Sequence, residues 1–230
     1  GGLDLLGVVT GSEGLLGMVA EATLRILRKP PVTRTLLAAF GSVPDAGACV
    51  AAIIADGLVP AAMEFMDRRC AEAVEAYNQP GYPLDAEAIL VIDADGVEAE
   101  VGDAIARITA IAQELGATVR EATGGKERAK IWAGRKAAFA AMGRLAPDMI
   151  CMDGTIPRHA LPKVLAEMDT LSDHYGLGFC NVFHAGDGNL HPLILFDLDK
   201  PGDLERAEAF GADILRLCVK VGGVLSGEHG

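Results

Sequence analysis

Segments with strand-like and helix-like patterns alternate from Val32 to the end of the chain, and this alternation constrains the fold more than any other feature. Strands are expected where β-branched and apolar residues form short runs, and helices where apolar residues recur at helical spacing and stop at a glycine. In the first half we expect strands at 32–40, 59–67, 88–96 and 117–122 and helices at 44–57, 68–77 and 97–115. This order predicts an α+β sandwich with split β-α-β units.

The second half continues the pattern. We expect helices at 126–145, 158–175 and 204–221 and strands at 147–157, 177–186 and 189–197. The first thirty residues differ, because glycines interrupt an apolar sequence that becomes strand-like at 21–31. Pro30 and Pro31 stop either a helix or a central strand. We therefore place a boundary there, with the tail of another domain at 1–31 and one larger domain at 32–230.

Charge and composition exclude several classes of function. The chain has 20 Lys and Arg against 32 Asp and Glu, a net charge of −12, which would repel nucleic acid and anionic lipid. It contains no apolar run of about 18 residues and no basic start typical of a signal peptide. Its five cysteines form no CxxC pair, so we expect reduced thiols. These features predict a cytoplasmic protein without a transmembrane segment, at most peripheral to a membrane.

Residues 181–191, NVFHAGDGNLH, hold the densest cluster of potential chemistry. If the flanking segments pair as a hairpin, His184 and His191 can face each other across the Gly-Asp-Gly-Asn turn. Two histidines and a carboxylate commonly hold a divalent first-row metal, and Glu228, in the glycine-rich stretch 222–230, is a candidate third ligand. The alternative is that both histidines are ordinary hydrogen-bonded residues at strand ends. His159 and His174 lie on a predicted helix and are expected to face solvent.

Two further segments could bind anions. Residues 11–17, GSEGLLG, could cradle a phosphate through backbone N–H groups, but they lack the lysine of a P-loop and the GxGxxG spacing, so a nucleoside triphosphate site is not expected. Arg135 lies on a predicted helix. It belongs either to a solvated basic turn or to a carboxylate clamp, because the planar guanidinium can bind both oxygens of a carboxylate.

Four motifs, taken together and in order, resemble a known family. They are GSEGLLGMVAEATLRILRKP, WAGRKAAFAAMGRLAPDMICMDGTIPR, FHAGDGNLHPLILFD and GGVLSGEHG. They are similar to the flavin-dependent 2-hydroxy-acid oxidoreductases of the vanillyl-alcohol-oxidase-like superfamily, and most of all to its glycolate-oxidase-like branch. The resemblance implies that 1–31 ends an FAD-binding domain, and that 32–230 is a ferredoxin-like FAD-linked oxidase C-terminal domain, truncated at its end, that holds the substrate.

The resemblance also implies roles for individual residues. His184, His191 and Glu228 look like the ligands of a divalent metal (zinc, manganese or iron), His229 like the catalytic base and Arg135 like the clamp for the substrate carboxylate. Asn189 is similar to a residue beside substrate or flavin. The residues that would line FAD are Gly11, Ser12, Glu13, Gly14, Gly17, Met18 and Val19.

One departure from the family bears on the substrate. Relatives that oxidise dicarboxylic 2-hydroxy acids carry a threonine one helical turn after the arginine and a lysine in the next strand, where this chain has Phe139 and, approximately, Cys151. The resemblance therefore favours a short D-2-hydroxy acid, glycolate or D-lactate. A D-lactate dehydrogenase, or a metal-binding or assembly module without catalysis, remains an alternative.

The glycolate-oxidase-like branch further implies partners, namely a second flavin-type subunit and an iron–sulfur subunit. The chain itself has no iron–sulfur motif. Because it starts near the end of the flavin domain, we expect it to be inactive by itself.

Overall fold

A four-stranded antiparallel sheet forms the centre of the computed structural model, which describes residues 2–228. Its strands are β1 (Val32–Phe40), β2 (Ala62–Asp67), β3 (Ala88–Gly96) and β4 (Thr118–Glu121), in the order β4-β1-β3-β2. Since β3 lies between β1 and β2, and β1 lies between β3 and β4, each β-α-β unit is split by another strand. The predicted α+β sandwich is confirmed.

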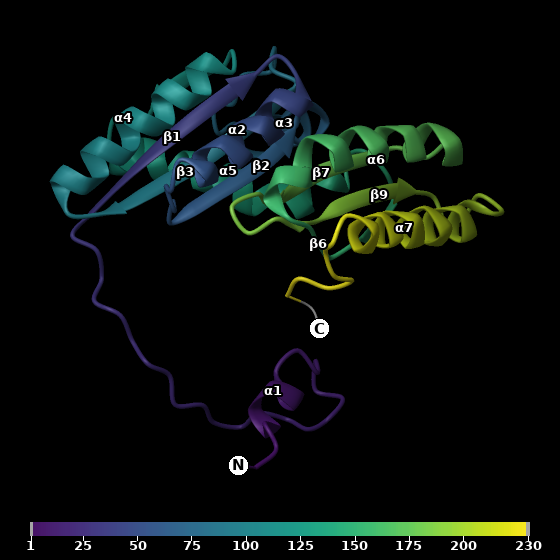
Figure 1. Ribbon diagram of the computed structural model, residues 1–230. Helices are drawn as coiled ribbons and strands as arrows, with labels where there is room; N and C mark the ends of the chain where they lie inside the picture. Colours follow the sequence, from purple (N-terminus) through teal and green to yellow (C-terminus); the bar gives the residue numbers. More distant parts are fainter. Residues whose placement is uncertain (1, 229–230) are drawn as a thin grey trace.

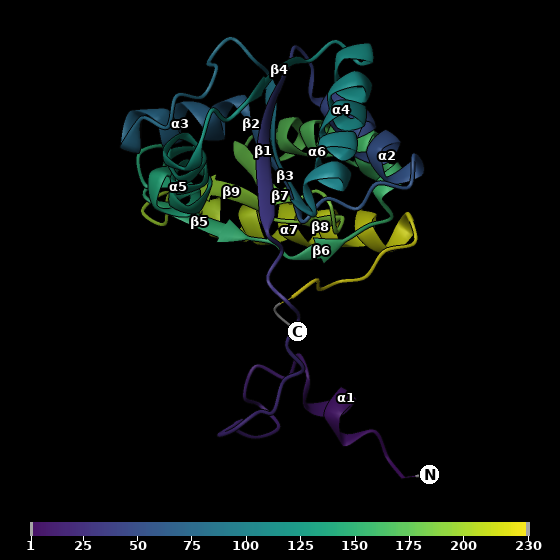
Figure 2. The same ribbon diagram turned by 90° about the vertical axis from the view of Figure 1, so that its left-hand side faces the viewer.

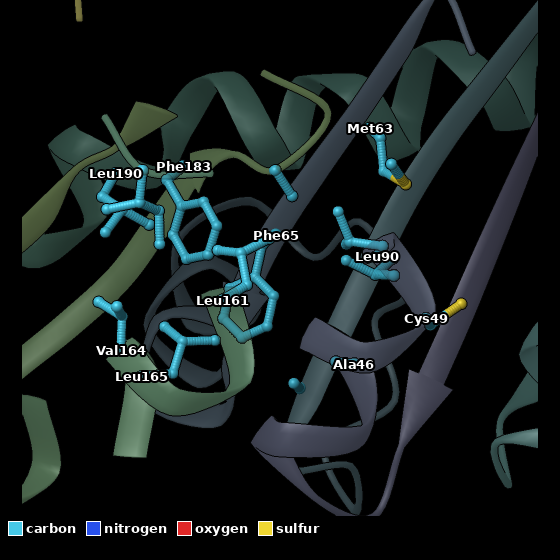
Figure 3. Packing of buried hydrophobic residues seen from close by; sticks show 14 of the residues in the cluster. Ala46, Cys49, Met63, Phe65, Leu90, Leu161, Val164, Leu165, Phe183 and Leu190 are labelled. Atoms are coloured by element: carbon cyan, nitrogen blue, oxygen red, sulfur yellow. The ribbon is translucent and has the colours of Figure 1, made fainter. Parts of the chain in front are cut away.

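Helices cover both faces of this sheet (Figures 1 and 2). The helices α2 (Val43–Ala55) and α4 (Glu98–Glu114) pack on one face, and α3 (Arg68–Asn78) and α5 (Gly125–Met142) on the other. Successive strand residues therefore enter different cores, because side chains alternate across a sheet. Figure 3 shows the core on the face covered by α2 and α4, where the rings of Phe65 and Phe183 stack with centroids 4.6 Å apart.

The second half of the chain extends the sheet beyond β2. The strand β7 (Phe179–His184) pairs with β2 through its last residues and with β9 (Pro192–Phe196) through its first. In the first of these ladders, Glu64 of β2 lies directly opposite His184. The remaining elements are β5 (Asp148–Cys151), β6 (Gly154–Thr155), β8 (Asn189–Leu190), α6 (Leu161–Tyr175) and α7 (Asp203–Lys220).

Two segments predicted as single strands are each broken in the middle. The predicted strand 147–157 divides into β5 and β6, and the predicted strand 189–197 divides into β8 and β9. The reason lies in the strand pairing, since β5 pairs with β9 whereas β6 pairs with β8. Each segment therefore leaves one ladder and enters another between its two short strands. Asp153 and His191 lie at this crossing, outside any strand.

The predicted helix 158–175 begins with a 3-10 turn, Arg158–Ala160, and is α-helical only from Leu161. His159 and His174 are exposed, as expected. The five cysteines are free, in agreement with the expected reduced thiols. Among the described helices, none is both long and apolar enough to span a membrane.

Residues 2–31 extend away from the sheet and its helices (Figure 1) and are almost entirely exposed. A short helix, α1 (Leu5–Val9), capped by Asp4, was not expected from the sequence. The strand predicted at 21–31 is wrong, because these residues have no regular structure. A strand needs a neighbouring backbone to accept and donate its hydrogen bonds, and no strand within residues 2–228 pairs with this segment.

Asp67 joins the two halves at the end of β2. One carboxylate oxygen accepts a 2.9 Å hydrogen bond from the backbone N–H of Cys70 and caps α3, and the other accepts from the backbone N–H of Asn181 on β7. Burial raises the pKa of this carboxyl to about 6, although both N–H groups act to lower it. The carboxylate thus satisfies two buried donors that belong to different parts of the fold.

Replacing Asp67 by alanine is expected to lower the free energy of unfolding by about 2–4 kcal/mol, since a helix cap is lost and a buried N–H is left unsatisfied. Urea titrations followed by circular dichroism measure the change. The control is Asp85→Ala, which removes an exposed carboxylate and should change stability by less than about 0.5 kcal/mol. Equal effects of the two variants would contradict this role of Asp67.

Candidate active site

The β7–β8 hairpin brings the two histidines together. In its ladder His184 pairs with Asn189, and His191 follows two residues later, so that the imidazole centroids lie 5.3 Å apart, edge to face. Gly188 makes the turn possible, because it adopts φ +72° and an added Cβ would lie 2.3 Å from the carbonyl oxygen of Ile156. The expected meeting of the two rings across the turn is what the structure shows.

Glu228 completes a cluster of three possible metal ligands. Its Oε1 lies 3.1 Å from Nε2 of His191 and 3.8 Å from Nε2 of His184. One ligand atom from each residue lies within 4.8 Å of the other two. His191 is buried, His184 is half-buried and Glu228 is exposed. Two imidazole nitrogens and a carboxylate oxygen at this spacing form a donor set suited to a divalent first-row metal.

Asp153, which no sequence motif had pointed to, holds the loop that carries Glu228. Its Oδ2 accepts hydrogen bonds from the hydroxyl of Ser226 (2.9 Å) and from the backbone N–H groups of Gly227 (2.9 Å) and Glu228 (3.1 Å). Only its position directly before a glycine, inside the strand predicted at 147–157, could have pointed to it. Because three donors converge on one carboxylate, the loop has a defined position beside His191.

Asn189 packs closely against the same loop. A Cβ added to Gly227 would lie 2.1 Å from the side-chain oxygen of Asn189, so only glycine allows the loop to approach. Asn189 is 5% exposed, and within residues 2–228 its Oδ1 has no hydrogen-bond partner. A buried carbonyl without a donor costs free energy unless a ligand supplies one. The expected contact of Asn189 with substrate or flavin stays a prediction, which the unpartnered carbonyl oxygen supports.

Arg135 is 8% exposed, so its interpretation as part of a solvated basic turn is wrong. It lies on α5, where its Nε donates to Oε2 of Glu64 at 3.0 Å and its Nη2 lies 2.8 Å from the same oxygen. The other oxygen of Glu64 lies 2.9 Å from Nδ1 of His184. Glu64 was missed by the sequence analysis, although an acidic residue inside the otherwise apolar strand 59–67 is a usable signal. It connects the arginine to the histidine–glutamate cluster.

The two histidines differ in electrostatic environment. The hydrogen bond to Glu64 raises the pKa of His184, although burial acts to lower it. Burial lowers the pKa of His191, while Glu228 acts to raise it. Cys151 lies behind His191, with Sγ 3.9 Å from Nδ1, and burial raises the pKa of its thiol to about 11. At neutral pH this thiol is uncharged.

The residues expected to line FAD lie in the exposed segment at the start of the chain. Positive φ angles occur at Gly11 (+78°), Glu13 (+48°), Gly14 (+84°) and Gly17 (+141°), and a Cβ added to Gly14 or Gly17 would meet nothing within 4 Å. Ser12 is half-buried, while Met18 and Val19 are exposed. Three of these four positive φ angles belong to glycines, which tolerate this conformation. His229, the expected base, lies outside the described residues.

Replacing Asp153 by alanine is expected to release the loop at Ser226 to Glu228, because the side-chain acceptor of the Ser226 hydroxyl and of the Glu228 N–H is lost. The Gly227 N–H keeps the backbone carbonyl oxygen of Asp153 as an acceptor at 3.1 Å. Hydrogen exchange at the amide of Glu228, followed by NMR, should therefore become at least about tenfold faster, which corresponds to about 1.4 kcal/mol. Asp199→Ala serves as the matched control, since this exposed carboxylate accepts none of the described side-chain hydrogen bonds. Unchanged exchange in the Asp153 variant would contradict the anchoring role.

Comparison with known proteins identifies the family. Residues 29–230 match the family described as FAD linked oxidases, C-terminal domain. The chain belongs to the FAD linked oxidases. Glycolate oxidase subunit GlcD of Escherichia coli K12 is 55% identical over 230 residues, which are all of this chain and 46% of that protein. GlcD of Bacillus subtilis is 35% identical over 230 residues, all of this chain and 49% of that protein.

A D-lactate dehydrogenase of Archaeoglobus fulgidus is 30% identical over 234 residues, covering all of this FAD linked oxidase and 50% of the relative. The chain thus spans about half the length of the curated relatives it matches. Among solved structures, alkyldihydroxyacetonephosphate synthase superposes with a TM-score of 0.67 at 16% identity, over 97% of this chain and 45% of the other. p-Cresol methylhydroxylase superposes with a TM-score of 0.65 at 15% identity, over 88% and 46%. These two similarities show the shared fold.

Proposed function

We propose that this chain is the substrate-binding part of an FAD-dependent enzyme that oxidises a short D-2-hydroxy acid, glycolate or D-lactate, to the 2-oxo acid. The observation that carries the proposal is the meeting of a metal-type donor set with a buried arginine, joined by Glu64, in a member of the FAD linked oxidases. Residues 1–31 would end the FAD-binding domain, and 32–230 would form the domain that covers the substrate.

FAD, when bound, supplies the acceptor for the hydride that leaves Cα of the substrate. The residues that would line it are Gly11, Ser12, Glu13, Gly14, Gly17, Met18 and Val19, with Asn189 beside substrate or flavin. The positive φ angles of Gly11, Gly14 and Gly17 support this role, because they favour glycine, which lets a backbone approach a ligand closely.

A divalent metal, when bound, polarises the substrate hydroxyl as a Lewis acid. His184, His191 and Glu228 would hold it, and the donor set fits zinc, manganese or iron. The two Nε2 atoms already face the same carboxylate oxygen, so the ligands need little rearrangement to converge on one ion.

Arg135 would bind the substrate carboxylate with the part of its guanidinium that Glu64 leaves free. An arginine has five N–H donors; Glu64 accepts the one on Nε and lies 2.8 Å from Nη2. One N–H of Nη1 and one of Nη2 would form an end-on fork for both oxygens of a carboxylate. His229 would accept the hydroxyl proton as the general base. Loss of that proton together with the Cα hydride converts the alcohol into the ketone or aldehyde.

The surroundings of the site favour a small substrate. Phe139, one helical turn after Arg135, is apolar, and Cys151 beside His191 carries no positive charge. A second carboxylate at the far end of a dicarboxylic substrate would gain no cation from either side chain. A D-lactate dehydrogenase is the second candidate, supported by the relative from Archaeoglobus fulgidus.

We further propose that the protein works in the cytoplasm, at most peripheral to the inner membrane, with a second flavin-type subunit and an iron–sulfur subunit. The support is the similarity to proteins named as subunits of glycolate oxidase. The alternative is that the protein is not an enzyme but a metal-binding or assembly module. Reduction of the flavin by substrate distinguishes these two functions, because only the enzyme would show it.

In the full-length flavoprotein we expect glycolate or D-lactate to bleach the flavin absorbance under anaerobic conditions, because two electrons pass to FAD with no acceptor to remove them. Stopped-flow spectroscopy measures the rate for each acid, and the L-enantiomer of lactate serves as the control. If no short 2-hydroxy acid bleaches the flavin, the non-catalytic module becomes the better interpretation.

Elemental mass spectrometry should find about one equivalent of a divalent metal in the wild-type protein and almost none in His191→Ala, because a buried ligand is lost. His174→Ala, in which an exposed histidine on α6 is removed, should retain the full equivalent. Metal-free wild-type protein, or equal content in both variants, would contradict the proposed site.

A further inference from the structure

Glu64 touches both halves of the candidate site. It is 7% exposed, and both of its carboxylate oxygens are engaged, Oε2 by Nε and Nη2 of Arg135 and Oε1 by Nδ1 of His184. A buried carboxylate is costly unless its charge is paired and hydrogen-bonded. Its place between an expected substrate clamp and an expected metal ligand calls for a functional explanation.

We infer that Glu64 is a positioning residue with two effects. It determines which ring nitrogen of His184 is free to bind a metal, and it fixes the orientation of the Arg135 guanidinium. This inference rests on the proposed function, since it assigns a role within the same site. Glu64 itself contacts neither metal nor substrate in this scheme.

The effect on His184 follows from the chemistry of a carboxylate. An ionised carboxylate only accepts hydrogen bonds, so Nδ1 of His184 must carry the proton at the 2.9 Å contact. A neutral imidazole then has its free lone pair on Nε2. Nε2 is the atom that faces Glu228, and this tautomer is therefore the one that can bind a metal. Partners of this kind, behind a ligating histidine, commonly raise metal affinity about 10–100-fold.

The effect on Arg135 is geometric. Glu64 binds one edge of the guanidinium, formed by Nε and Nη2, and the rigid plane of that group then fixes where its end points. Arg135 is itself buried, so without Glu64 its charge would be unpaired. Glu64 thus orients the N–H donors of Arg135 that are left for a substrate, and it neutralises the charge of the guanidinium.

The backbone gives this arrangement its precision. Glu64 and His184 are directly opposite each other in the β2–β7 ladder, where Cβ atoms of paired residues lie about 5 Å apart. Residues of α5 pack on the same face as Met66 and Val182, the neighbours of Glu64 and His184 two positions away. The register of the sheet, rather than a flexible loop, sets the distance between carboxylate and imidazole.

The substitution Glu64→Gln would reverse the tautomer. An amide side chain has one acceptor oxygen and one NH2 donor group, and the always-charged Arg135 would take the oxygen. The NH2 group would then face Nδ1 of His184 and need a lone pair there, which moves the imidazole proton to Nε2. If Arg135 is also replaced by methionine, the amide oxygen is free to accept from Nδ1, and the metal-binding tautomer returns.

The test compares wild-type protein with Glu64→Gln, Arg135→Met and the double variant Glu64→Gln/Arg135→Met, in the full-length flavoprotein. Competition with a chelator gives the dissociation constant for zinc, the 15N spectrum of the His184 ring gives the tautomer, and steady-state kinetics give KM and kcat. Glu121→Gln is the matched control, since Glu121 on β4 makes a similar two-point pair with Arg34 at 2.6 and 2.7 Å, outside the site.

We expect Glu64→Gln to bind zinc about 10–100-fold more weakly with the proton on Nε2, and the double variant to recover most of the affinity while KM stays raised as in Arg135→Met. Glu121→Gln should match the wild type. A merely structural role would not be rescued by removing a second residue, so a double variant that remains weak would overturn the inference. Wild-type affinity in folded Glu64→Gln would overturn it as well.

The two proposals fail in different ways. If the wild-type protein binds no zinc, the metal site itself is wrong, and the role of Glu64 at His184 is wrong with it. If the wild type binds zinc and Arg135→Met raises KM, but Glu64→Gln retains wild-type affinity and the proton on Nδ1, only the inference about Glu64 is wrong.

Discussion

The antiparallel pairing of β2 with β7 is the interaction on which the rest of the structure depends. It joins the ferredoxin-like sheet of the first half to the strands of the second half. The two cores continue across it, with Phe65 stacked on Phe183 on one face and Met66 packed in the same cluster as Val182 on the other. Asp67, at the end of β2, stabilises this junction by accepting hydrogen bonds from the backbone N–H groups of Cys70 and Asn181. A shift of one residue in this register would place Glu64 and His184 on opposite faces of the sheet.

Most of the fold could be predicted from the sequence because its helices and central strands have strong periodicity and clear glycine stops. The strands at 147–157 and 189–197 were predicted as continuous because their composition gives no sign of a break. The break arises from tertiary pairing, since β5 and β6 belong to different ladders. The strand predicted at 21–31 is wrong for a related reason. Its composition suits a strand, but strand formation depends on a partner, which no sequence pattern of the segment itself records.

The candidate site shows the same division. His184, His191 and Glu228 could be found from rare residue types in glycine-rich stretches, and the structure brings them together. Glu64 and Asp153 were missed because each is a single acidic residue whose importance comes only from what it touches. Asp153 accepts hydrogen bonds from backbone N–H groups of a loop more than seventy residues later in the chain. Glu64 contacts Arg135 on α5 and His184 on β7, which are also distant from it in the sequence. Such partners are properties of the fold rather than of local sequence.

The pairing of Arg135 with Glu64 has a consequence for the overall charge that a ligand meets. Glu64 cancels the charge of the arginine. If the proposed divalent ion is bound, the carboxylates of Glu228 and of Asp153, which lies beside His191, would together balance the charge of the ion. The formal charges of these groups would then sum to zero before a ligand binds. A monocarboxylate would add one uncompensated negative charge and a dicarboxylate two, so the charge balance of the proposed site would disfavour dicarboxylates more strongly.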